Sequence, residues 1–164
     1  MKKSVINKLL VSVTLLIMML TSASPVKAQK VADKELVGVW LMESMQWEGE
    51  SKTICGKDYT QVKVYRANGE YACAEIAKSN NKYIVLPHEY GTYTFKNGKY
   101  TEMGRNGILK LVSKDTFTGQ WKTRHDVWKK KAMPAKLVDY IVMCCKTKEG
   151  TKEMQDLIKK YCFK

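Results

Sequence analysis

Three hydrophobic patterns follow one another along the chain. An unbroken apolar run, Leu9 to Leu20, comes first. From Leu36 to about Trp128, short runs rich in Val, Ile, Thr, Tyr and Trp are interrupted by turn residues, which is typical of strands. From Pro134 onward the apolar residues recur at helical spacing. The sequence therefore predicts an all-β domain with a helical extension, and it contains no internal repeat or low-complexity linker.

Two Asn-Gly pairs predict β-hairpins, because Asn and Gly supply the positive φ angles that tight turns require. Asn68-Gly69 would join Tyr59 to Ala67 with Glu70 to Ala77, and Asn97-Gly98 would join Tyr90 to Lys96 with Lys99 to Met103. Further strands are predicted at Val37 to Trp47, Lys82 to Leu86, Ile108 to Val112, Thr116 to Thr123 and Val127 to Lys130. About eight short consecutive strands favour an antiparallel up-and-down barrel. A two-sheet sandwich fits the strand count nearly as well.

Alternation along each strand assigns side chains to one face or the other, because residues two apart share a face. Four sets are predicted to point into the barrel: Val62 and Val64; Gly91, Tyr93 and Phe95; Tyr100 and Glu102; Phe117, Gly119 and Trp121. Trp40 and Trp128, near the first and last strands, are expected to be core residues that seal a barrel end.

The C-terminal segment is predicted to be a helical hairpin with one apolar stripe on each helix. The stripes are Leu137, Tyr140, Ile141, Cys144 and Cys145, then Met154, Leu157, Ile158 and Tyr161. Pro134 suits a first helical turn, and Thr151 is expected to cap the second helix. The hairpin is expected either to pack outside the barrel or to close one end. A more specific possibility is that its helices contact a partner, including a second copy of the chain in a homodimer.

The N-terminus has the zones of a secretory signal peptide. Lys2, Lys3 and Lys8 precede the apolar run, and small residues near Ala28 suit cleavage there. The run is too short to cross the hydrocarbon core, which needs about 20 residues, although a retained signal anchor is an alternative. The expected organisation is signal peptide 1–28, leader 29–35, barrel 36–131 and helical extension 132–164. We expect a periplasmic or secreted protein without a transmembrane segment after cleavage.

Positive charge favours anionic partners without choosing among them. The chain carries a formal net charge of +13, and cleavage after Ala28 would remove four of its 29 basic side chains and no acidic one, leaving +9. Apart from the run Lys129 to Lys131 the lysines are scattered, which indicates a solvated basic surface. Export argues against a nucleic-acid partner.

The residues that could support catalysis or metal binding form no recognisable motif. Five cysteines lie in the exported part without C-x-x-C or zinc-like spacing, so no metal or cofactor is expected, and the odd count leaves one or two disulfides or buried free thiols. His88 and His125 stand in loop-like settings. A hydrolase or thiol enzyme would need one of them within hydrogen-bond reach of a cysteine or carboxylate. We therefore assign no catalytic residue.

Several short motifs, in order, resemble exported lipocalin-like (calycin-like) domains of Gram-negative bacteria, especially small families of unknown function. They are Leu36-Val37-Gly38-Val39-Trp40, Gly91-Thr92-Tyr93, Tyr100-Thr101-Glu102, Phe117-Thr118-Gly119-Gln120-Trp121 and Val127-Trp128-Lys129-Lys130. The resemblance covers residues 36–131 and implies an antiparallel barrel with a mouth at one end that binds a small, often apolar ligand. The helical tail is additional to the pattern.

The predicted ligand-binding residues are Tyr93, Tyr100, Glu102, Trp121 and Arg124. A carboxylate inside a barrel is costly unless it meets a cation or several donors, so Glu102 is expected to pair with Arg124, Arg105 or a ligand amine. A purely structural pairing with a tyrosine hydroxyl or an arginine is the alternative. The first hypothesis is a noncatalytic binding protein for a small apolar or amphipathic ligand. The second is a filled barrel that binds an anionic or protein partner through its basic surface or helical tail.

Overall fold

The computed structural model describes residues 34–96 and 99–163. The predicted signal peptide and its cleavage site lie outside these residues. The described elements are β1 (Gly38–Trp47), β2 (Thr53–Ile54), β3 (Tyr59–Tyr65), β4 (Glu70–Ser79), β5 (Lys82–Lys96), β6 (Lys99–Glu102), β7 (Arg105–Ser113), β8 (Thr116–Trp121), β9 (Arg124–Lys130), α2 (Ala135–Thr147) and α3 (Gln155–Cys162).

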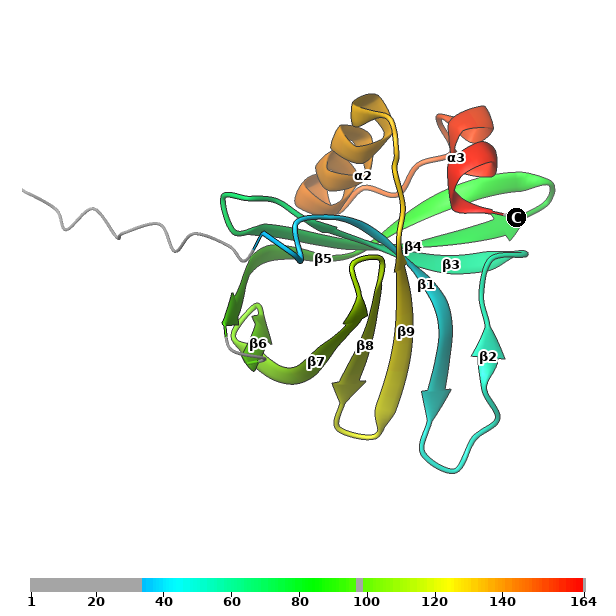
Figure 1. Ribbon diagram of the computed structural model, residues 1–164. Helices are drawn as coiled ribbons and strands as arrows, with labels where there is room; N and C mark the ends of the chain where they lie inside the picture. Colours follow the sequence, from blue (N-terminus) through cyan, green and yellow to red (C-terminus); the bar gives the residue numbers. More distant parts are fainter. Residues whose placement is uncertain (1–33, 97–98, 164) are drawn as a thin grey trace, which may run out of the picture.

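The sheet closes on itself (Figure 1), because β1 pairs antiparallel with β3 on one side and with β9 on the other. Between them β3 to β9 follow one another in chain order, and every neighbouring pair is antiparallel. The two-residue β2 lies outside this ring, beside β1. The fold is therefore the predicted eight-stranded up-and-down barrel, and the two-sheet sandwich is excluded.

The first predicted hairpin is confirmed, since β3 and β4 pair across a turn in which Gly69 has a φ of 83°. The turn residues of the second, Asn97 and Gly98, lie outside the described residues, but Lys96 pairs with Lys99 on either side of them. The two strands predicted at 82–86 and 90–96 are one continuous strand, β5. Its register against β4 shifts at His88, and such a bulge lets a strand bend and accommodates Pro87.

Two hydrophobic clusters lie on opposite faces of β3 and β4. The barrel cluster fills the lumen with residues such as Trp40, Tyr65, Phe117 and Trp128. The helix cluster lies between the outer faces of the strands and the two helices. Of the side chains predicted to face the lumen, Tyr93, Phe95, Tyr100, Phe117 and Trp121 belong to the barrel cluster, and Glu102 is buried against Lys63 and Tyr65 of β3.

The prediction for Val62 and Val64 is wrong, because both belong to the helix cluster. Lys63 and Tyr65, the alternate residues of β3, point into the lumen instead, where both contact Glu102. The physical reason is that the helices bury the outer face of β3, so six of its seven residues are buried. With both faces buried, apolar character no longer marks the lumen.

The helices pack on the outside of the barrel, with α2 against β4 and β5, and α3 against β5. Pro134 is the N-terminal boundary residue of α2, as predicted. The prediction that Thr151 caps α3 is wrong: Met154 occupies that position. Thr151 is instead held extended by two backbone hydrogen bonds with Val85, of 3.0 and 3.1 Å. This short bridge fixes the connection between the helices to β5.

All five cysteines are free and buried, which corresponds to the buried-thiol alternative. Burial raises the pKa of Cys73 and of Cys162 to about 12 and that of Cys145 to about 11. These thiols are therefore protonated at neutral pH. Neither helix in the described part of the chain has the length and apolar character needed to cross a membrane.

Candidate functional site

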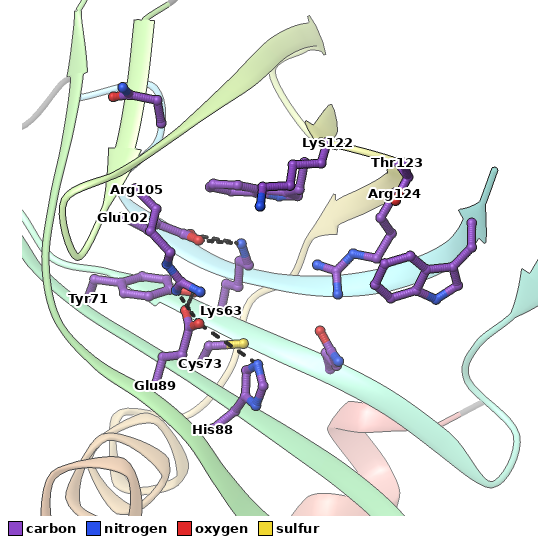
Figure 2. Close-up of a pocket in the computed structure, with 14 residues that line it drawn as sticks. Lys63, Tyr71, Cys73, His88, Glu89, Glu102, Arg105, Lys122, Thr123 and Arg124 are labelled. Atoms are coloured by element: carbon purple, nitrogen blue, oxygen red, sulfur yellow. Dashed lines mark hydrogen bonds and ion pairs between the residues drawn. The ribbon is translucent and has the colours of Figure 1, made fainter.

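A cavity of about 530 Å³ opens at one end of the barrel, where β1 ends, β7 begins and the β8–β9 turn crosses. We call it the mouth cavity; Figure 2 shows its lining side chains. Trp47 and Trp121 supply its large apolar surfaces. Lys63 and Glu102 line it from the lumen side, where both are almost completely buried.

The floor of the mouth cavity is a buried ion pair between Lys63 and Glu102. The Lys63 ammonium lies 2.8 and 2.9 Å from the two carboxylate oxygens, and the side chains are only 4% and 3% exposed. The Tyr65 hydroxyl donates a third hydrogen bond to Glu102, at 2.6 Å. Burial, followed by the charge of Glu102, raises the pKa of Tyr65 well above its ordinary value, so this hydroxyl keeps its proton.

Aromatic rings surround the Lys63 ammonium. Its Nζ atom lies 4.9 Å from the ring centre of Trp128 and 5.1 Å from that of Trp121, distances at which a cation is attracted to the face of a ring. Tyr71 and Tyr100 lie slightly farther away. The charge is thus compensated by a carboxylate and by ring faces, which is what a buried ammonium requires.

Below this floor, packed aromatic rings fill the lumen. Trp40 donates from Nε1 to the Leu36 carbonyl at 2.9 Å, and its ring meets that of Phe117 edge-on at 4.7 Å between centres. Phe117 stacks on Trp128 at 5.8 Å. Leu36, Trp40 and Trp128 are fully buried. The mouth cavity therefore ends at the ion pair, and packed rings lie beneath it in place of a deep apolar tunnel.

One side of the rim is held by Glu89. Its carboxylate accepts from Arg105 and, at 3.1 Å, from the Tyr71 hydroxyl. Burial opposes ionisation of Glu89, but the hydrogen bond and charge of Arg105 outweigh it and hold its pKa below the ordinary value. The exposed His88 ring has its Nε2 atom 3.8 Å from the same carboxylate, which is longer than a hydrogen bond.

The opposite side of the rim is formed by Arg124. Its Nη2 atom donates to Oδ2 of the buried Asp126 at 2.9 Å, and its guanidinium lies 5.6 Å from the ring centre of Trp47. Within residues 34–96 and 99–163, Arg124 Nε, Asp126 Oδ1 and Trp128 Nε1 are buried and have no hydrogen-bond partner. Buried polar atoms are normally paired with protein, water or ligand atoms, and these three depart from that pattern.

Glycine on the neighbouring strand positions the Trp121 ring. A Cβ atom on Gly107 would lie 2.6 Å from the nearest carbon of that ring, so the indole covers the space that a side chain would occupy. Tyr100 meets the same ring edge-on at 5.3 Å between centres. The wall of the cavity formed by Trp121 is therefore fixed by contacts on two sides.

The structure brings three of the five predicted site residues together, since Glu102, Trp121 and Arg124 line the mouth cavity. Tyr100 lies behind Trp121 and hydrogen-bonds the Tyr65 hydroxyl at 2.5 Å. Tyr93 donates to the Arg66 carbonyl at 3.0 Å, near the start of β1 at the far end of the barrel. The cation that pairs with Glu102 is Lys63, and neither Arg124 nor Arg105 makes that contact.

Sequence reasoning missed Lys63, Gln61, Cys73 and Trp47, which also line the cavity. The sequence of β3 did contain a signal, because polar and aromatic residues alternate with Val62 and Val64: Tyr59, Gln61, Lys63 and Tyr65. A strand face of polar and aromatic side chains is suited to line a polar pocket. No group of three or more His, Cys, Asp or Glu residues in the described part of the chain is arranged to hold a metal ion.

No family model and no curated protein matches the chain. Among solved structures, the chain is similar to a lipocalin-like protein from Bacteroides uniformis ATCC 8492, with 9% sequence identity and a TM-score of 0.34. The match covers 58% of this chain and 98% of the other.

Proposed function

We propose that this protein is an exported, noncatalytic binding protein that holds a small amphipathic molecule in the mouth of its barrel. The observation that carries the proposal is the mouth cavity itself, of about 530 Å³, in a closed barrel. Ligand sites of proteins usually measure about 300–1,000 Å³ and combine apolar walls with a few placed polar groups. The signal-peptide pattern of residues 1–28 supports export.

The lining favours an amphipathic over a purely apolar ligand. Trp47 and Trp121 offer apolar contact, whereas the floor is the Lys63–Glu102 ion pair and the rim carries further charged side chains. A purely apolar molecule would cover these polar groups without replacing their contacts with water, which costs free energy. A ligand with a polar group beside its apolar body avoids this cost.

Native mass spectrometry tests the proposal on the mature protein purified from its own exported fraction, beside a denatured sample. We expect an additional mass that is lost on denaturation, and a lower occupancy in Gly107→Ala, where the displaced Trp121 ring narrows the cavity. Val112→Ala, an exposed position on the same strand, is the matched control. A wild-type protein that stays bare after incubation with a lipid and small-molecule extract would overturn the proposal and favour an interaction role for the basic surface or the helices.

A further inference from the structure

The carboxylates that line the mouth cavity are already paired with basic side chains. Glu102 accepts two hydrogen bonds from Lys63 and one from Tyr65. Glu89 accepts from Arg105 and from Tyr71. Each carboxylate is thus neutralised by a basic side chain and supported by a tyrosine hydroxyl. A ligand ammonium would therefore find no carboxylate in the cavity whose charge is uncompensated.

Basic side chains that reach the cavity, in contrast, lie at the β8–β9 turn. The Arg124 guanidinium lines the cavity, and Asp126 and the ring of Trp47 fix its position; its Nε atom is unpaired but buried in the protein. Lys122, in the turn, makes no hydrogen bond or ion pair within the part of the chain that the structure describes, and Figure 2 shows it beside Arg124 at the mouth. Asp126, whose Oδ1 atom is also unpaired, is not among the residues that line the cavity.

Charge and apolar surface therefore occur together at one side of the mouth. Four basic side chains line the cavity (Lys63, Arg105, Lys122 and Arg124), against two acidic ones. Lys63 and Arg105 pair with the two acidic residues of the cavity. Lys122 and Arg124 do not, and both follow Trp121 closely in the chain. Guanidinium and ammonium groups bind carboxylate, sulfonate and phosphate oxygens through charge-assisted hydrogen bonds.

We propose that the mouth cavity selects amphipathic anions. An oxyanion group accepts hydrogen bonds from Arg124 and Lys122, and a flat apolar body attached to it lies against Trp121. This inference rests on the proposed binding function and adds the charge and shape of the ligand. The anionic group can be a carboxylate, a sulfonate or a phosphate, because the donors recognise the shared oxyanion chemistry.

Two fluorescent probes with the same aromatic body separate charge from apolar contact: 1-anilinonaphthalene-8-sulfonate and its uncharged counterpart N-phenyl-1-naphthylamine. Equilibrium titrations of the mature protein are expected to give at least about tenfold tighter binding of the sulfonate, the range of one charge-assisted contact. Raising the salt concentration is expected to weaken binding of the sulfonate alone, because salt screens its charge.

Three variants assign the preference to the proposed donors. Lys122→Gln and Arg124→Lys are expected to weaken sulfonate binding about 3-fold to 30-fold and to leave binding of the neutral probe within about twofold. Arg124→Lys keeps a positive charge beside the buried Asp126 and removes the planar guanidinium with its fixed set of N–H donors. Lys114→Gln is the matched control, because it removes the same charge at the other end of β8.

The outcomes separate this inference from the proposed function. If both probes bind equally, or if Lys122→Gln behaves like Lys114→Gln, the selection of anions is wrong while a binding function stands. If neither probe binds to the wild-type protein, the proposed function and this inference fail together. A sulfonate preference that Lys122→Gln and Arg124→Lys both reduce supports the inference.

Discussion

Breaking the buried Lys63–Glu102 pair by removing one partner should cost much of the protein's stability. At a separation of 2.8 Å, the Coulomb attraction is about 6 kcal/mol for an effective dielectric constant of about 20. Desolvation offsets much of this attraction in the intact pair. Removing one partner is different, because the remaining charge stays buried without compensation.

The perturbation is Lys63→Met, which keeps the apolar stem and removes the ammonium. Glu102 then retains only the hydrogen bond from Tyr65. We expect the free energy of unfolding to fall by about 3–5 kcal/mol, which corresponds to a melting temperature lower by roughly 10–20 °C for a domain of this size. The double variant Lys63→Met/Glu102→Gln is expected to lose markedly less than the sum of the two single variants, because it contains no unpaired charge.

The assay is urea unfolding of the protein without residues 1–28 at neutral pH, followed by tryptophan fluorescence and far-ultraviolet circular dichroism. Arg105→Gln is the control: its partner Glu89 is at the rim and Arg105 itself is 58% exposed, so the expected loss is below about 1 kcal/mol. The claim of a coupled ion pair at the floor of the cavity would be refuted by a loss below about 1 kcal/mol for Lys63→Met, together with losses for Lys63→Met and Glu102→Gln that simply add in the double variant.

Three further predictions concern the wall, the thiols and the rim. Gly107→Ala should destabilise the fold because its Cβ meets the Trp121 ring at 2.6 Å, and adding Trp121→Leu should restore part of the loss; a loss that Trp121→Leu leaves unchanged would contradict the contact. Cys73, with its pKa raised to about 12 by burial, should resist a thiol-specific disulfide reagent at pH 8 until urea unfolds the protein; rapid labelling of the folded chain would show that it is accessible. The folded pKa of Glu89 is lowered from 4.5, so its ionised form stabilises the fold above that value, and this stabilisation is lost as the pH falls through the folded pKa. Glu89→Gln should therefore be less stable than wild type in urea at pH 7, and the difference should shrink as the pH is lowered below 4.5; a difference that stays constant over this range would speak against it.

The hairpins, the consecutive strand order and the helical tail were predictable because each depends on residues close in sequence. The Asn68-Gly69 turn fixes β3 beside β4, and the apolar spacing after Pro134 places one face of α2 on the barrel. Closure of the barrel follows from the meander once the last strand meets the first.

The residues that line the mouth cavity were only partly predictable, because they depend on which face of each strand turns into the lumen and on what covers the other face. The register of β1 against β9 shifts between Met42 and Ser44, so the lumen-facing positions change from Trp40 and Met42 to Met45 and Trp47. Strict alternation from Trp40 would place Trp47 outside.

The partner of Glu102 was unpredictable for a related reason. Lys63 precedes it by 39 residues, and the two meet only because the closed barrel directs β3 and β6 into one lumen. Sequence alternation identified Glu102 as inward but could not decide which of the 29 basic side chains would reach it.

The measurement that tests the central claim most directly is a titration of the four tryptophan indole N–H signals by two-dimensional NMR with 1-anilinonaphthalene-8-sulfonate. Trp47 and Trp121 line the mouth cavity, whereas Trp40 is fully buried in the lumen and donates to Leu36. We predict that the indole signals of Trp47 and Trp121 shift on binding and that the Trp40 signal stays in place. A shift of Trp40 with Trp47 and Trp121 unchanged, or no shift of any indole signal, would contradict a ligand site at the mouth of the barrel.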